Sequence, residues 1–248
     1  MNAFDYRASA IPIRADLGLA HRRAWEQLAS PGTWWTGEER LSIARETRLA
    51  GACALCRARR QALSASEVTG GHGRSGALPA VAVEAVHRIV TDASRLTRSW
   101  LDGLLAEGLS DAHYVELLGV VVTVLCIDGF HRAMGLPLEP LPEPRPGRPS
   151  RRRPASARLE MGWLPTIPAD LATGGEADLY AGAPRVPNVV RALSLVPDAV
   201  RTLKELSVAQ YVPLEQVPDV KADPGRALSR AQMELVAGRV SALNECFY

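Results

Sequence analysis

The sequence predicts an all-α protein. Apolar residues recur at helical spacing along most of the 248 residues, and no segment alternates apolar and polar residues as a half-buried strand does. No two apolar runs are joined by a hairpin turn signal. Hydrophobic residues make up 47% of the chain and the mean hydropathy is -0.04, which is typical of globular proteins that bury a full core.

Six predicted helices precede residue 135. They are residues 17–29, a helix that follows Thr36, residues 53–63, a helix that opens at Pro79, residues 96–107 and residues 111–134. Thr36 with Glu39 three residues later has the pattern of a capping box, and Ser110 is the predicted N-cap of the last helix. Residues 64–77 are rich in Ser and Gly, so we expect a mobile loop there.

The composition changes after residue 137. Prolines and arginines predominate up to about residue 157, without an aromatic platform or a recognition helix beside them, so we expect a linker and no nucleic-acid partner. Helical spacing resumes at residues 188–211, with an interruption at Pro197, and a final helix starts at Ser229. The predicted organisation is a helical domain at residues 1–140, a Pro/Arg/Gly-rich linker at 141–187 and a truncated second half at 188–248.

The composition also narrows the cellular setting. The longest apolar run, residues 117–127, is 11 residues long and is expected to be a buried helix, because a bilayer span needs about 20 residues. Residues 1–14 lack the basic start and apolar stretch of a secretory leader. Four cysteines with one C-x-x-C indicate redox or metal chemistry rather than a secreted disulfide framework. We therefore expect a cytoplasmic protein without a membrane partner.

The C-terminal segment repeats a pattern from the first half. When the sequence is displaced by 193 residues, four of the 25 overlaid positions are identical, including the turn before a helix and the cysteine after it. The overlaid pairs are Pro31-Gly32 with Pro224-Gly225, Thr36 with Ser229, Ala44 with Ala237, and Cys53 with Cys246. We interpret this as an internal duplication whose second copy stops inside its C-x-x-C motif, because the partner of Cys56 would follow Tyr248.

The stretch RALSRAQMELVAGRVSALNECFY resembles the active-site helix of the alkylhydroperoxidase AhpD-like, carboxymuconolactone decarboxylase-related family. In that family a glutamate lies twelve residues before a C-x-x-C, and a histidine follows four residues after it. Glu234 lies twelve residues before Cys246. The first half resembles the same fold in the order of its elements, through GEERLSIARETRLAGACALC and GLSDAHYVELLGVVVTVLCIDGFHRAMGL.

The resemblance implies thiol-dependent reduction of a hydroperoxide substrate, with an external dithiol as reductant and no organic cofactor. It implies that Cys246 is the resolving thiol and Glu234 a proton-relay carboxylate, with Cys53 and Cys56 as the dithiol of the first half. It also implies a homo-oligomer. Because the group includes suspected selenoproteins, a selenocysteine codon read as a stop after Tyr248 is a further hypothesis.

The first half departs from the family pattern. Leu41 and Arg60 occupy the positions of the family's glutamate and histidine, so we expect a dithiol without its proton relay and impaired peroxidase activity. Two other functions stay open: a non-catalytic helical interaction protein, and a dithiol redox partner or sensor that uses Cys53 and Cys56 alone.

The cysteines and histidines also have structural interpretations. Cys53 and Cys56 could be half of a zinc site or a structural pair, although no second C-x-x-C exists and His72 and His87 lack the usual ligand spacing. Cys126 is expected to be a buried small hydrophobe. His87, together with His113 and His131, is expected to lie on a helix face or in the core, with nothing placing it beside a nucleophile.

Overall fold

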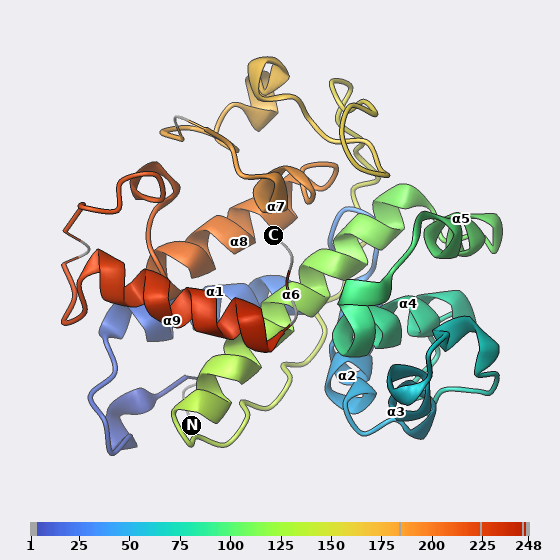
Figure 1. Cartoon of the computed structure of the whole chain (residues 1–248). Coiled ribbons are helices and arrows are strands. Elements are labelled where there is room, and N and C mark those ends of the chain that lie inside the picture. Colours follow the sequence, from blue (N-terminus) through green and yellow to red (C-terminus); the bar gives the residue numbers. More distant parts are fainter. Residues whose placement is uncertain (1–3, 184, 224, 245, 247–248) are drawn as a thin grey trace.

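A computed structural model describes residues 4–183, 185–223, 225–244 and 246. Within these residues the fold is all-helical, with nine α-helices and no β-strand, which confirms the predicted class (Figure 1). The only extended pairing among them is an isolated antiparallel bridge between Arg158 and Thr166.

The helices of the first half lie close to their predicted positions. They are α1 (Ala15–Ala29), α2 (Gly37–Ala50), α3 (Ala54–Gln61), α4 (Ala80–Asp92), α5 (Arg98–Ala106) and α6 (Asp111–Ala133). The capping box is confirmed, because Thr36 accepts a hydrogen bond from Glu39 N and the Glu39 carboxylate accepts one from Thr36 N. Ser110 likewise caps α6. Three further helices follow, α7 (Asn188–Arg191), α8 (Pro197–Gln210) and α9 (Arg230–Leu243), and Pro197 is the first residue of α8.

The main hydrophobic core lies where α2 packs against α1, α4 and α6, and where α8 packs against α1 and α6. Figure 1 shows α8 alongside α1 and α6. Side chains from all of these helices are fully or almost fully buried in the core, among them Leu28, Leu41, Ile43, Val86, Leu117, Val121, Val200 and Leu206. The predicted second half therefore contributes α8 to the same core as the predicted first domain.

The longest helix, α6, is long and apolar enough to cross a bilayer by length and composition alone. Its most apolar window is nevertheless 61% buried inside the fold, as in the core helix of a soluble protein. Leu117 and Ile127 have no exposed surface, which confirms the buried helix predicted for residues 117–127. Cys126 is half-buried against the core, and burial raises the pKa of its thiol.

Two helices carry the same cap at positions 193 residues apart. Ser229 and Gln232 form a capping box at the start of α9, as Thr36 and Glu39 do at the start of α2. The first and last residues of the two helices are separated by the same interval. Their surroundings differ, because α2 is packed in the core whereas α9 exposes its apolar side chains, including Leu235 at 76%.

The segment expected to be a linker is extended and hydrogen-bonded to the helices that it crosses. Arg145 N donates to Ala29 O at 2.8 Å, and Arg151 N donates to Thr33 O at 2.8 Å. The indole of Trp25 on α1 donates to Pro140 O at 2.9 Å. These bonds hold the first part of the segment against α1 and the loop that follows it.

A cluster of the half-buried Tyr6 with the buried His21 and His131 joins the N-terminal segment to α1 and α6. The Tyr6 hydroxyl lies 2.6 Å from His21 Nδ1 and 2.9 Å from His131 Nε2, and Gln210 lies 2.8 Å from His21 Nε2. Burial, with a smaller contribution from His131, lowers the pKa of His21 to about 4. His21 is therefore neutral in the folded protein at pH values where an unfolded histidine is charged.

This shift predicts acid destabilisation. Between pH 6.5 and about 4 the unfolded chain binds a proton at His21 that the folded chain does not. The free energy of unfolding should therefore decrease as the pH is lowered through this range. The loss from this residue should be about 3 kcal/mol. Urea denaturation at several pH values should show a flatter profile for His21→Gln than for the wild type. Equal slopes for His21→Gln and the wild type would contradict the assignment.

Candidate functional site

The C-x-x-C motif opens α3. After α2 ends at Ala50, Ala52 N donates to Leu49 O and Cys53 N donates to Ala50 O, and these bonds turn the chain sharply. Cys53 is the N-cap of α3 and Cys56 lies in its first turn. Cys53 is half-buried, whereas Cys56 is only 2% exposed. The turn thus places both sulfurs at a helix N-terminus, with Cys53 the more exposed of the two residues.

His72 reaches these sulfurs from the Gly-rich loop. Its Nδ1 lies 3.5 Å from Cys53 Sγ and 3.5 Å from Cys56 Sγ. Both the backbone N–H and the hydroxyl of Ser75 donate to Glu46 Oε1, at 2.6 and 2.9 Å. The loop predicted from composition is therefore bonded to α2 and directed at the two cysteines.

His87 comes from α4, and its position corrects the sequence interpretation. That interpretation placed nothing beside His87, yet His87 Nδ1 lies 3.3 Å from Cys56 Sγ, and its ring centroid is 4.2 Å from that of His72. The physical reason is tertiary, because α4 packs against both α2 and α3. His131 is a buried core histidine, as expected, and His113 contacts Ser110 and Arg151 at the start of α6.

Each of the two histidines is backed by a carboxylate. His72 Nε2 lies 2.8 Å from Glu84 Oε2, and His87 Nε2 lies 3.1 Å from Glu46 Oε2. A carboxylate can only accept, so both Nε2 atoms carry a proton and both Nδ1 atoms face the sulfurs. Glu46 and Glu84 thus fix the tautomer and the orientation of the rings.

The electrostatics distinguish the two thiols. Burial opposes ionisation of Cys53, but interactions with the backbone of Cys56, with His72 and with the backbone of Gly73 outweigh it and lower the pKa of Cys53 to about 6. Burial, reinforced by the neighbouring Cys53 sulfur, raises the pKa of Cys56 to about 11. The site therefore favours a thiolate at Cys53 over one at Cys56.

The charges around His72 complement that thiolate. Burial of Glu84 is outweighed by hydrogen bonds from His72 and Arg59, which lower the pKa of Glu84 to about 2. Burial likewise disfavours the charged form of His72, but its bonds to Glu84 and Cys53 raise the pKa of His72 overall. Arg59 donates to both Glu84 oxygens, at 2.8 and 3.1 Å.

A cleft of about 570 Å³ borders this site at His72 and Glu84, although neither cysteine lines it. It is lined by both polar and apolar groups, including Arg59, Gly70, Gly71, His72, Glu84 and Trp100. The Trp100 indole also lies 3.4 Å from Glu84 Oε1. A small molecule in the cleft can therefore approach His72, which touches both sulfurs.

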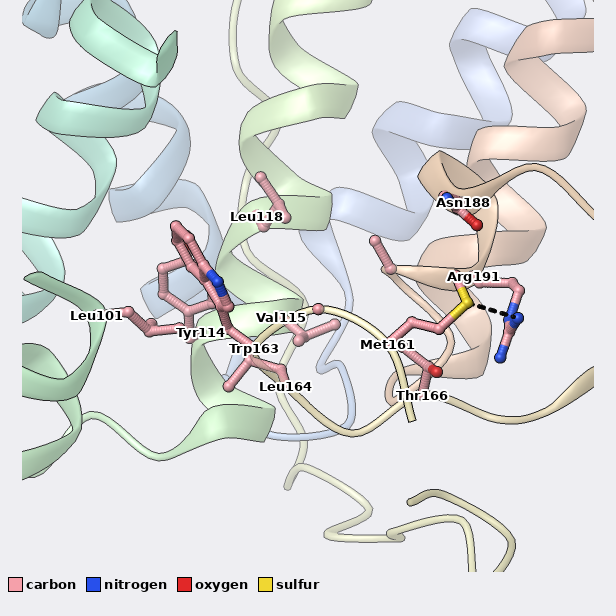
Figure 2. A pocket seen from close by; sticks show the side chains of 12 residues that line it. Leu101, Tyr114, Val115, Leu118, Met161, Trp163, Leu164, Thr166, Asn188 and Arg191 are labelled. Carbon is pink, nitrogen blue, oxygen red and sulfur yellow. Dashed lines mark hydrogen bonds between the residues drawn. The ribbon is translucent and has the colours of Figure 1, made fainter. Parts of the chain in front are cut away.

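A separate apolar cavity of about 270 Å³ lies between α5, α6 and the segment that leads to α7 (Figure 2). Tyr114 and Trp163 lie on one side of it in Figure 2, and Met161 lies beside Arg191 on the other. Arg191 is already paired with Glu160 at 2.7 Å, so its charge is compensated. None of the site's cysteines or histidines lines this cavity, which suits an apolar group rather than the thiol chemistry.

The donor atoms of Cys53, Cys56, His72 and His87 all lie within 4.8 Å of one another, so this set could hold a metal ion. Among the described residues, no other group of His, Cys, Asp and Glu has this arrangement. The two cysteines were predicted as site residues, but the histidines that join them were not.

The predicted residues of the second half lie elsewhere. Glu234 on α9 accepts hydrogen bonds from Tyr211 and Arg230, and Cys246 is exposed after the end of α9. Phe247 and Tyr248, which complete the quoted motif, lie outside the described residues.

The dithiol expected to lack a glutamate and a histidine has two carboxylate–histidine pairs beside it. Leu41, at the family's glutamate position, is a core residue, whereas Glu46 comes from five residues further along α2.

No protein-family model, curated protein or solved structure matches this chain.

Proposed function

We propose that the chain is a thiol-dependent hydroperoxide reductase related to the AhpD-like family, with Cys53 and Cys56 as its redox pair. One observation carries the proposal: each sulfur lies within 3.5 Å of a histidine Nδ1 whose ring is held by a carboxylate. This arrangement supplies a nucleophile, a resolving thiol and groups that move protons.

Cys53 is the attacking residue in this proposal, because it is the more exposed of the two residues and the one whose thiol pKa is lowered. Its thiolate attacks the outer oxygen of the hydroperoxide, the O–O bond breaks, and Cys53 becomes a sulfenic acid. The alkoxide that leaves takes the Nδ1 proton of a doubly protonated His72, the form that its raised pKa favours, and departs as an alcohol.

Cys56 then resolves the sulfenic acid. His87 accepts the Cys56 proton and the sulfur attacks Cys53 Sγ. The S–O bond breaks, and the proton on His87 passes to the leaving hydroxide to give water. The two sulfurs lie within 4.8 Å, so small movements at the helix start allow them to bond. One hydroperoxide and two thiols thus give one alcohol, one water and a disulfide, which an external dithiol reduces by exchange.

The test is stoichiometric oxidation of reduced, metal-free protein. One equivalent of tert-butyl hydroperoxide should remove two titratable thiols from the wild type, and peptide mass analysis should find a Cys53–Cys56 disulfide. A matched variant with Cys126→Ser and Cys246→Ser should behave identically, whereas Cys53→Ser should form no such disulfide. Retention of all four free thiols would reject a redox role. Disulfide formation with diamide but not with hydroperoxide would favour the dithiol redox partner.

A further inference from the structure

We propose that the reduced site binds one Zn²⁺ ion through Cys53 Sγ, Cys56 Sγ, His72 Nδ1 and His87 Nδ1. The inference goes beyond hydroperoxide reduction and does not rest on it, because binding requires reduced thiols but no reaction with peroxide. It follows from the spacing of the donors, their orientation and their chemical type.

The spacing fits a tetrahedral ion. With Zn–S bonds of about 2.3 Å and Zn–N bonds of about 2.0–2.1 Å, sulfur and nitrogen ligands of one ion lie about 3.5 Å apart. The sulfur–nitrogen distances between neighbouring donors here are 3.3, 3.5 and 3.5 Å. All four donors lie within 4.8 Å of one another.

The histidines are oriented as metal ligands. A ligating histidine usually donates its other ring N–H to a carboxylate or a carbonyl, which fixes the ring and makes the coordinating nitrogen more basic. Both histidines do so, His72 with Glu84 at 2.8 Å and His87 with Glu46 at 3.1 Å. Ser75 and Arg59 in turn hold the two carboxylates.

The donor set selects the metal. Thiolate and imidazole ligands favour zinc over calcium or magnesium, and four protein ligands leave no open position, as in structural zinc sites. The two thiolates neutralise the charge of Zn²⁺, so the ion and its four ligands together carry no net charge. The carboxylates of Glu46 and Glu84 lie behind the histidines and are not ligands. Binding replaces two protons on the donor groups with the ion.

Zinc at this position would have two consequences. It would join the Gly-rich loop, through His72, to α3 and α4. It would also occupy both sulfurs, so the zinc-loaded protein would be protected from hydroperoxide until the ion is removed. The site would then alternate between a zinc-bound dithiol and a disulfide.

The experiment uses the full chain, reduced and stripped of metal, titrated with ZnCl₂ and separately with CoCl₂. We expect one equivalent of zinc per chain, and a cobalt spectrum with tetrahedral d–d bands and thiolate charge-transfer bands. Bound zinc should protect Cys53 and Cys56 from alkylation, as read by peptide mass analysis, while labelling of Cys246 is unchanged.

Variants assign the ligands. His72→Asn should abolish tight binding, and the matched control His113→Asn should bind as the wild type does. Glu84→Gln, which keeps all four ligands, should weaken zinc binding about 10- to 100-fold. Circular dichroism would identify a variant that fails to fold. If His72→Asn does not fold, Glu84→Gln still tests the site, because it keeps all four ligands.

Three results would overturn the proposal: binding well below one equivalent, an octahedral cobalt spectrum, or equal affinities for His72→Asn and His113→Asn. A protein that binds zinc but reduces no hydroperoxide would support this inference and count against the proposed function. Hydroperoxide reduction without zinc binding would overturn this inference alone.

Discussion

Cys53→Ser is expected to slow hydroperoxide consumption by about a thousandfold or more, because a hydroxyl cannot replace the thiolate that attacks the O–O bond. The serine oxygen is smaller than the sulfur and Cys53 is half-buried, so the fold should tolerate the change. The measurement is the initial rate of cumene hydroperoxide loss with dithiothreitol as reductant, using metal-free protein.

Cys56→Ser is the informative companion. It should still form a sulfenic acid at Cys53, detectable with dimedone, but it should not form the intramolecular disulfide. Cys246→Ser and Cys126→Ser should react at rates close to the wild type. A large loss of rate in Cys246→Ser with none in Cys53→Ser would place the reactive thiol in the second half instead.

Arg48→Ala is expected to lower the free energy of unfolding by about 3–5 kcal/mol. Arg48 on α2 forms two hydrogen bonds with Asp128 on α6, at 2.8 and 2.9 Å, and a third with Glu139 O at 2.8 Å. The Asp128 side chain is only 2% exposed, so loss of the arginine leaves a buried carboxylate without its main partner. Urea denaturation at neutral pH measures the effect.

Arg98→Ala is the matched control for this ion pair. Arg98 and Asp102 form a pair one helical turn apart in α5, with both side chains about half exposed. Such a surface pair contributes less than about 1 kcal/mol. A similar small loss for Arg48→Ala would mean that Arg132, 4.0 Å from Asp128, takes over the role of Arg48.

Local sequence signals were sufficient to predict most helices. Thr36 with Glu39, Ser110, and Ser229 with Gln232 cap helices because their side chains bond to backbone groups within four residues. The buried position of residues 117–127 likewise follows from an uninterrupted apolar run. These features need no information about distant parts of the chain.

Only half of the candidate site was predictable, because its residues are brought together by contacts between distant parts of the chain. Cys53 and Cys56 form a recognisable motif, but His72 and His87 follow after intervals of 15 and 14 residues, which match no common ligand pattern. Their convergence depends on how α4 packs and where the Gly-rich loop returns. Glu46 gave a weak signal in the sequence, because a charged residue on the apolar face of a helix needs a buried partner. Its side chain is fully buried and bonds to His87.

The packing of α8 against α1 and α6 bears on how the protein folds during synthesis. The first 140 residues contain the cysteine–histidine cluster, yet the core is closed by side chains such as Val200 and Leu206. Until residues 197–210 leave the ribosome, a nascent chain must therefore expose the apolar surfaces that α8 later covers. The core beside the site is thus completed by a helix that lies far along the chain from it.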